Sequence, residues 1–214
     1  MKYDTMIFDL DGTLLNTLDD LASSVNYALE RCGYPLRTTE EVRTFIGNGV
    51  SILMRRAIPK EATDCEHSKA LDIFKDHYAQ NSRNTTKPYA GIIDMLKTLK
   101  EKGYSLAIVS NKIDFAVKDL RDEFFFDYID VAIGDSEDTE NKPAPDMVYK
   151  ALDELGKDGG KAVYVGDTDV DLQTAENSGM DCISVSWGYR THTELEGYGA
   201  KMIADTPDEV LKYI

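Results

Sequence analysis

The sequence predicts an α/β protein in which helices cover both faces of a parallel sheet, with a helical insertion after the first strand. From residue 85 onward, short apolar segments alternate with amphipathic ones, which is typical of a parallel sheet covered by helices. Between residues 16 and 84, the periodicity of apolar residues is helical throughout. The run Met6-Ile7-Phe8 before this insertion indicates a short, buried first strand.

The elements of the sheet region are expected at the following positions. Strands are predicted at residues 3–10, 104–110, 130–134, 162–166 and 182–186, and helices at residues 92–100, 115–123, 146–155 and 172–178. A last helix is expected after Thr206, because Thr206 and Glu209 have the spacing of a capping box. These elements describe a Rossmann-like core.

The insertion begins with an amphipathic helix. Leu18, Leu21, Val25 and Leu29 recur at three- and four-residue spacings, and Gly33 is a stop signal. Further helices are predicted at residues 39–46, 50–58 and 64–80. We therefore expect residues 1–15 and 85–214 to form a catalytic core and residues 16–84 to form a helical cap domain. Open parallel sheets bind ligands beyond the carboxyl ends of their strands, so this insertion is placed to act as a lid.

The composition excludes several classes of partner. The 214 residues include 24 Lys and Arg against 39 Asp and Glu, a formal net charge of −15. Nucleic acids and anionic membranes bind basic surfaces, so neither is expected as a partner. Three widely spaced cysteines, no apolar run of ~20 residues, and acidic residues within the first ten positions predict a reduced, cytoplasmic protein.

Acidic residues follow two of the predicted strands. Asp9 and Asp11 lie two apart at the end of the first strand, where both side chains are expected on one face. Like charges this close require a bound cation or a shared proton, although Asp11-Gly12 is also a common turn. Asp167 follows the strand at residues 162–166 and is carried to the same sheet edge. Three carboxylates form a hard-oxygen site suited to Mg²⁺, with Asp171 as a further ligand or as a residue that orients one.

Two other segments offer groups that bind phosphate. Ser110 and Asn111 end a strand and provide a hydroxyl, an amide and backbone N–H groups. Lys142 precedes the stiff turn Pro143-Ala144-Pro145. Alternatively, Ser110 caps a helix and Lys142 is a solvated surface residue.

Together these residues carry a resemblance to a known family. The segment Asp9-Leu10-Asp11-Gly12-Thr13-Leu14, the pair Ser110-Asn111, the pair Lys142-Pro143, and Gly166-Asp167 with Asp171 resemble the four ordered motifs of the haloacid dehalogenase-like hydrolase superfamily. The helical insertion is similar to that superfamily's cap. Residues 45–49 and 187–190 resemble the corresponding segments of its phosphoglycolate phosphatase branch.

The resemblance implies a role for each matched residue. Asp9 is the expected nucleophile, which forms an aspartyl phosphate, and it is also an expected Mg²⁺ ligand. Asp11 is the expected general acid and base, and its main-chain carbonyl is expected to bind the metal. Asp167 completes the metal site, and Asp171 is a candidate ligand. Ser110, Asn111 and the amide of Gly12 are expected to hold phosphoryl oxygens, and Lys142 to offset negative charge.

The predicted cap also offers candidates for binding substrate. Gly47, Asn48 and Gly49 lie between two helices, where their amides can bind a small anion; the alternative is a plain helix–helix turn. Arg43, Arg55 and Arg56 are candidates for holding a substrate carboxylate.

The expected function is that of a Mg²⁺-dependent phosphatase acting on a small phosphorylated metabolite, most similar to phosphoglycolate phosphatases. A β-phosphoglucomutase-like phosphotransferase and an inorganic pyrophosphatase are the enzymatic alternatives, because the same aspartyl phosphate serves them. A receiver-like signalling domain is the non-enzymatic alternative. Receivers are generally ~120 residues long and have no lid, which disfavours this reading.

Overall fold

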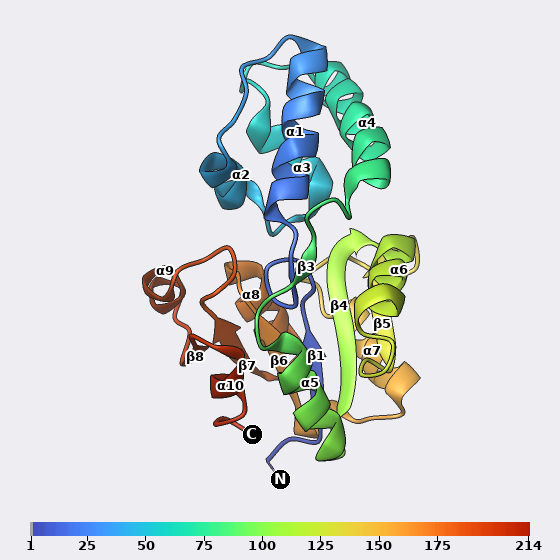
Figure 1. Cartoon of the computed structure of the whole chain (residues 1–214), viewed down its shortest axis with the longest axis vertical. Helices are drawn as coiled ribbons and strands as arrows, with labels where there is room; N and C mark the ends of the chain where they lie inside the picture. Colours follow the sequence, from blue (N-terminus) through green and yellow to red (C-terminus); the bar gives the residue numbers. More distant parts are fainter. Residues whose placement is uncertain (1) are drawn as a thin grey trace. The chain divides into compact units, whose positions relative to one another are not determined.

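The computed structural model describes residues 2–214 and divides the chain into two compact units. One consists of the N-terminal segment up to Leu15 together with Pro88–Ile214, and the other is Asn16–Lys87 (Figure 1). The chain thus passes between the units after residues 15 and 87. The sequence predicted these boundaries after residues 15 and 84. Two short strands, β2 (Leu15–Asn16) and β3 (Lys87–Pro88), pair with each other at these passages.

The larger unit is built on a six-stranded sheet, which confirms the predicted fold class. Its strands are β1 (Thr5–Phe8), β4 (Ser105–Ile113), β5 (Val131–Asp135), β6 (Ala162–Gly166), β7 (Asp181–Val185) and β8 (Met202–Ala204). The strand order is β5-β4-β1-β6-β7-β8, and all five neighbouring pairs are parallel. Because β1 lies between β4 and β6, residues that follow these three strands are neighbours in space.

Helices cover both faces of this sheet (Figure 1). The helices of the larger unit are α5 (Ile92–Glu101), α6 (Asp114–Phe124), α7 (Asp146–Leu155), α8 (Asp169–Asn177), α9 (His192–Gly197) and α10 (Pro207–Val210), with a 3₁₀ turn at Gly159–Lys161. Met6 and Phe8 pack into the hydrophobic core shared with α5, α6 and α10, whereas Ile7 packs into the core shared with α7 and α8. Burial on both faces explains why Met6, Ile7 and Phe8 are apolar at successive positions of β1.

The smaller unit has a hydrophobic core of its own. Its helices are α1 (Leu18–Cys32), α2 (Thr39–Phe45), α3 (Gly49–Ala57) and α4 (Asp64–Asn81). Leu29, Met54 and Phe74 are among the side chains that fill this core. Helix α1 ends at Gly33, whose φ of 74° lies in the left-handed region that glycine adopts without strain.

Some boundaries differ from the sequence prediction. Strand β4 continues to Ile113, three residues beyond its predicted end, and α8 begins at Asp169, three residues before its predicted start. The capping box expected at α10 is wrong: Glu209 Oε2 accepts a hydrogen bond from the Asp205 N–H at 2.9 Å. This short helix lets Glu209 reach the backbone one residue before the expected cap.

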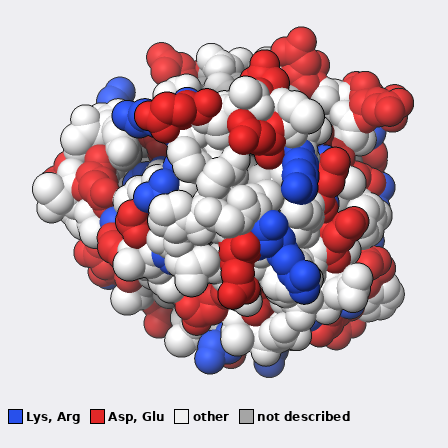
Figure 2. All heavy atoms as spheres, turned by 90° about the horizontal axis from the view of Figure 1, so that it is seen from above, with Lys and Arg blue, Asp and Glu red and all other residues white. Residues whose placement is uncertain are grey.

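Acidic side chains outnumber basic ones in the chain, 39 to 24. On the face drawn in Figure 2, acidic side chains are spread widely and basic ones lie between them in small groups. Within residues 2–214, none of the helices combines the length and the apolar character needed to cross a bilayer.

Candidate active site

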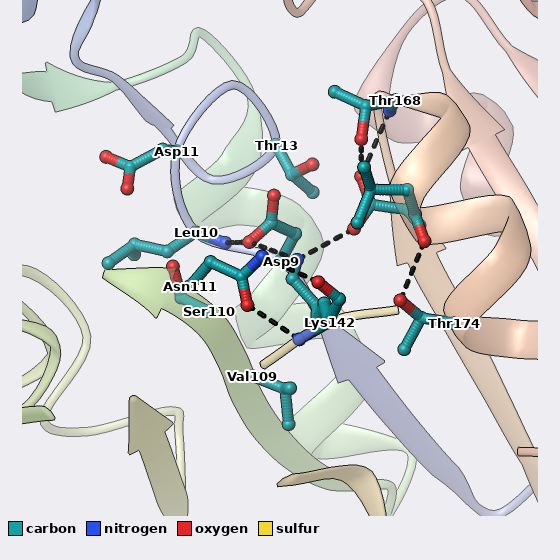
Figure 3. A network of polar contacts seen from close by, with 12 residues as sticks. Asp9, Leu10, Asp11, Thr13, Val109, Ser110, Asn111, Lys142, Thr168 and Thr174 are labelled. Carbon is teal, nitrogen blue, oxygen red and sulfur yellow. Dashed lines mark hydrogen bonds and ion pairs between the residues drawn. The ribbon is translucent and has the colours of Figure 1, made fainter. Parts of the chain in front are cut away.

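The site lies at the carboxyl ends of three neighbouring strands of the larger unit. Asp9 follows β1, Ser110 lies in the last part of β4, and Asp167 follows β6. Lys142 lies in the loop before α7 (Figure 3). Asp171 lies in the first turn of α8. Carboxylate oxygens of Asp9, Asp167 and Asp171 all lie within 4.8 Å of one another. Residues separated by about 160 positions in the chain therefore meet at one edge of the sheet.

Asp9 is buried, and both of its contacts within residues 2–214 fall on one carboxylate oxygen. Its Oδ1 atom accepts a hydrogen bond from the Leu10 N–H at 2.7 Å and lies 2.9 Å from Lys142 Nζ. Both contacts fall on Oδ1, so among the described residues Oδ2 has no hydrogen-bond partner. Burial raises the pKa of Asp9, and although Lys142 opposes this effect, the pKa reaches about 7.

Lys142 is a buried cation held between two carboxylates. Its ammonium group lies 2.8 Å from Asp171 Oδ1 and donates to the Tyr164 hydroxyl at 3.1 Å, in addition to its contact with Asp9. Burial alone would lower the pKa of Lys142, but Asp171 and Asp9 outweigh it and raise the pKa well above the ordinary lysine value. Lys142 is therefore charged at neutral pH, contrary to the reading of a solvated surface lysine.

Asp171 uses both carboxylate oxygens within the protein. Oδ1 contacts Lys142 and accepts from the Tyr164 hydroxyl at 3.3 Å, and Oδ2 accepts from the Thr168 N–H at 3.0 Å and its hydroxyl at 2.8 Å. A side chain at Gly166 would collide with Asp171, so glycine is required there. These contacts favour a role for Asp171 in orienting Lys142.

Asp167 is fully buried in a narrow slot. The Thr13 hydroxyl donates to its Oδ1 at 2.9 Å, and the Tyr189 N–H donates to its Oδ2 at 2.6 Å. A Cβ atom at either Gly12 or Gly188 would collide with its carboxylate, and Gly12 has a φ of 89°. Burial, followed by the charges of Asp171 and Asp9, raises the pKa of Asp167 well above its ordinary value.

The three-carboxylate cluster has the chemistry of a site for a hard divalent cation. Lys142 is the cation in contact with Asp9 and Asp171. Burial, with a smaller contribution from neighbouring carboxylates, raises the pKa of Asp9 and of Asp167, so a bound cation would favour the charged forms of both. Within residues 2–214, the group of potential metal ligands here consists of buried carboxylates and includes no thiol or imidazole, which suits Mg²⁺, so the residues fit this ion.

The Asp11 carboxylate does not lie in the cluster with those of Asp9 and Asp167, where the sequence predicted it. In Figure 3 its carboxyl group points away from Asp9 and Lys142. Both of its oxygens contact the ammonium group of Lys112, at 2.8 and 2.9 Å. The strand geometry behind the expectation ends at Phe8, and the chain turns at Gly12, whose N–H donates to the Leu15 carbonyl. The alternation of side chains along a strand therefore does not extend to Asp11.

Ser110 and Asn111 lie within β4 and not at a helix start, because α6 begins at Asp114. Ser110 is buried, and its Oγ accepts a hydrogen bond from the Lys112 N–H at 3.3 Å. The Asn111 amide donates to the Lys142 carbonyl at 3.0 Å and accepts from the Lys142 N–H at 2.7 Å. Asn111, which the sequence suggested as a substrate ligand, therefore uses its amide to hold the main chain of Lys142.

The comparison with protein families agrees with this geometry. Residues 6–185 match the family model described as haloacid dehalogenase-like hydrolase. The chain belongs to this family. It is a phosphatase of the haloacid dehalogenase-like type, as the relatives described next also indicate.

Relatives of this hydrolase extend over most of its length. The phosphoglycolate phosphatase of Aquifex aeolicus is 35% identical over 185 residues, covering 86% of this chain and 85% of the relative. The phosphoglycolate phosphatase of Mannheimia succiniciproducens is 32% identical, with 97% and 96% covered. A solved structure from Lactobacillus delbrueckii, provisionally assigned as a phosphoglycolate phosphatase, is 39% identical, with a TM-score of 0.97 over 100% of this chain and 99% of the other.

The glycine-rich segment of the helical unit forms the turn between α2 and α3. Gly47 and Gly49 have φ values of 130° and 79°, which favour glycine. Arg56 donates to the Asn48 side chain and to the Phe45 carbonyl, both at 2.8 Å. These contacts explain the turn structurally, and binding of substrate by Gly47, Asn48 or Gly49 stays a prediction.

Several residues of the site were not found from the sequence. Lys112 directly follows the Ser110-Asn111 motif but carries no pattern of its own. Tyr164 was assigned only to a buried strand, although its hydroxyl lies between Lys142 and Asp171. Gly188 and Tyr189 lie in the segment 187–190 that the resemblance had singled out, but their role in enclosing Asp167 was not predicted.

Proposed function

We propose that this protein hydrolyses a small phosphate monoester through an aspartyl-phosphate intermediate, with Mg²⁺ as its cofactor and 2-phosphoglycolate as the first candidate substrate. The single observation that carries the proposal is that Asp9 is held through one carboxylate oxygen while the other has no partner among residues 2–214. Its Oδ1 is fixed by Leu10 and Lys142. A carboxylate fixed through one oxygen presents the other to an electrophilic phosphorus atom.

In the proposed reaction, Asp9 Oδ2 attacks phosphorus and the bond from phosphorus to the ester oxygen breaks. Asp11 donates a proton to the departing alcohol and, as the carboxylate, accepts one from the water that hydrolyses the aspartyl phosphate. The Asp11 carboxylate must leave Lys112 to do so, because it points away from Asp9 in this structure. Its position after Asp9 in a glycine-containing turn supports such a movement.

Phosphoryl oxygens require donors around Asp9. Ser110 supports this role because its Oγ accepts from the Lys112 N–H, so its own O–H is available to donate. The main-chain amides after Asp9 are the other proposed donors, including that of Gly12 once it releases the Leu15 carbonyl. Lys142 supplies positive charge beside the attacking carboxylate, which stabilises the charge that develops during phosphoryl transfer.

Asp9 and Asp167 are the proposed side-chain ligands of Mg²⁺, together with the main-chain carbonyl of Asp11. When bound, the ion would supply Lewis-acid stabilisation of phosphoryl oxygens. Asp171 is assigned to orienting Lys142, since its two oxygens already accept hydrogen bonds from Lys142, Tyr164 and Thr168.

The helical unit Asn16–Lys87 is proposed to act as a cap that contributes to substrate specificity. Its place in the chain supports this role, because the insertion begins shortly after the Asp9–Leu14 loop. Residues that confer specificity often lie on segments inserted at the carboxyl ends of strands.

A substrate panel tests the proposed function. The purified protein with Mg²⁺ is assayed against 2-phosphoglycolate, pyrophosphate, nucleoside monophosphates and hexose phosphates, and kcat/KM is compared. The proposal predicts that 2-phosphoglycolate is preferred by at least about tenfold, which corresponds to about 1.4 kcal/mol of transition-state binding. A flat profile, a preference for pyrophosphate, or isomerisation of a sugar phosphate without phosphate release would refute it.

A further inference from the structure

We propose that Lys112 forms a subsite for a second anionic group of the substrate: a carboxylate on the carbon that bears the ester oxygen. This inference deepens the proposed function and rests on it. It assigns substrate selection to a residue of the larger unit, in addition to any contribution from the helical unit.

Lys112 already binds a carboxylate in this structure. Its ammonium group lies 2.8 and 2.9 Å from the two oxygens of Asp11, and the residue is only 6% exposed. A buried ammonium that contacts both oxygens of one carboxylate is positioned to hold another carboxylate of similar size. Lys118 offers a contrast, because it pairs with Asp114 on the surface of α6 with half of its side chain exposed.

The position of Lys112 matches the leaving-group end of the substrate. The main chain fixes this position, because Lys112 lies two residues beyond Ser110 in β4 and its N–H contacts the Ser110 hydroxyl. Its partner Asp11 is the proposed proton donor to the ester oxygen. In 2-phosphoglycolate a single methylene group separates that oxygen from the carboxylate, so the substrate carboxylate and the Asp11 carboxylate lie within reach of the same ammonium.

The other buried cations of the described chain are less suitable. Lys112, Lys142 and Arg190 are the basic side chains that are buried within residues 2–214. Lys142 is held between Asp9 and Asp171 at the phosphorus end of the proposed site. Arg190 lies 3.8 Å from Asp169, an acid outside the three-carboxylate cluster.

The three arginines of the helical unit that the sequence suggested as carboxylate ligands have partners in that unit. Arg43 pairs with Glu40, and Arg55 pairs with Asp64. Arg56 donates to the Phe45 carbonyl and to Asn48. Lys112 is therefore the buried cation that directly adjoins the proposed leaving-group acid.

On substrate binding, Lys112 is proposed to exchange the Asp11 carboxylate for the carboxylate of the substrate. When the substrate carboxylate binds Lys112, it replaces one or both contacts to Asp11, and the Asp11 side chain becomes free to turn toward the ester oxygen. A phosphate ester without the carboxylate leaves Lys112 paired with Asp11. The subsite therefore favours 2-phosphoglycolate over 2-hydroxyethyl phosphate, which replaces the carboxylate with a neutral hydroxymethyl group.

Binding measurements test the subsite without depending on turnover. The Asp9→Asn protein, in the presence of Mg²⁺, is titrated calorimetrically with 2-phosphoglycolate and with 2-hydroxyethyl phosphate. A charge-assisted contact predicts that 2-phosphoglycolate binds roughly 10- to 100-fold more tightly. Adding Lys112→Met should remove most of this preference, whereas adding Lys118→Met should leave it unchanged.

A second pair of variants controls for misfolding, since Lys112→Met leaves Asp11 without its partner. The preference is compared between the Asp9→Asn/Asp11→Asn protein and the same protein carrying Lys112→Met. The subsite predicts that the preference is retained in the first and lost in the second. An equal loss of affinity for both ligands would overturn it and leave Lys112 as a positioning residue for Asp11.

The outcomes separate this inference from the proposed function. Equal binding of the two ligands to the Asp9→Asn protein overturns the subsite even when the wild-type protein hydrolyses 2-phosphoglycolate. A preference that depends on Lys112 supports the subsite even when the wild-type protein releases no phosphate from either ester, and in that case only the proposed reaction fails.

Discussion

The side-chain amide of Asn111 makes two hydrogen bonds with the main chain of Lys142, one to its carbonyl at 3.0 Å and one from its N–H at 2.7 Å. This pair of bonds joins β4 to the loop before α7. It fixes the backbone from which the Lys142 ammonium reaches Asp9 and Asp171. Asn111 thus controls the position of the Lys142 charge through the main chain of Lys142.

Replacing Asn111 by alanine should therefore lower both stability and activity. Loss of two buried hydrogen bonds is expected to cost about 1–3 kcal/mol in the free energy of unfolding. We expect kcat to fall at least about tenfold, because a displaced Lys142 stabilises the transition state less well. Urea denaturation and steady-state kinetics measure the two effects. Asn177→Ala is the matched control, because the exposed Asn177 amide donates one hydrogen bond to the carbonyl of Pro143, the residue after Lys142. This substitution should change kcat little.

Replacing Lys142 by methionine should be strongly destabilising. The change leaves Asp9 and Asp171 buried without their cation, which is expected to cost about 3–5 kcal/mol. Denaturation in EDTA measures this loss, with the exposed Lys118→Met as control. Adding Asp171→Asn should restore part of the stability, because it removes one unpaired charge. A Lys142→Met protein as stable as wild type would contradict the described charge balance.

The stability of the metal-free protein should depend on the ionisation of Asp9. Its pKa rises from 3.8 to about 7 on folding, so the folded protein holds this proton more tightly than the unfolded chain. The contribution of Asp9 to stability is thus lost as pH rises from about 4 to about 7. Asp9→Asn, which does not titrate, should stabilise the metal-free protein more at pH 8 than at pH 5. Denaturation in EDTA at both pH values checks the sign, and an equal effect at both would contradict it.

Mg²⁺ should stabilise the folded protein through the three-carboxylate cluster. A ligand present at 100 times its Kd stabilises the folded state by about 2.7 kcal/mol, so the Tm should rise by several degrees. Asp167→Asn should abolish most of this rise, because it removes a charged oxygen ligand from the cluster. Asp169→Asn is the matched control, because Asp169 lies outside the cluster and should retain the full shift. Equal shifts in the two variants would place the cation elsewhere.

The sheet could be predicted from the sequence because its central strands are apolar at nearly every position and are separated by amphipathic helices. Strand β8 was missed because Met202–Ala204 spans three residues, too few to show a periodicity. Helix α9 was also absent from the prediction, because it has only six residues. Boundaries were less accurate where polar residues continue an element, as Asn111 and Lys112 do at the end of β4.

The acidic site was predictable in part for a topological reason. Parallel strands end at one edge of the sheet, so Asp9 and Asp167 could be placed together without knowing any side-chain contact. The direction of Asp11 could not be derived, because it depends on a turn at Gly12 and on a lysine from another strand. The roles of Tyr164 and Tyr189 depend on a hydroxyl and a main-chain N–H, whose positions leave no pattern in the sequence.

Chemical trapping of the aspartyl phosphate tests directly whether Asp9 accepts the phosphoryl group. The protein is mixed with Mg²⁺ and 2-phosphoglycolate, quenched, reduced with borohydride and mapped by peptide mass spectrometry. Reduction of an acyl phosphate converts the modified aspartate to homoserine. Nucleophilic attack by Asp9 predicts homoserine at residue 9 and none in the Asp9→Asn protein. Homoserine at another aspartate, or phosphate release by Asp9→Asn at a rate close to that of wild type, would contradict it.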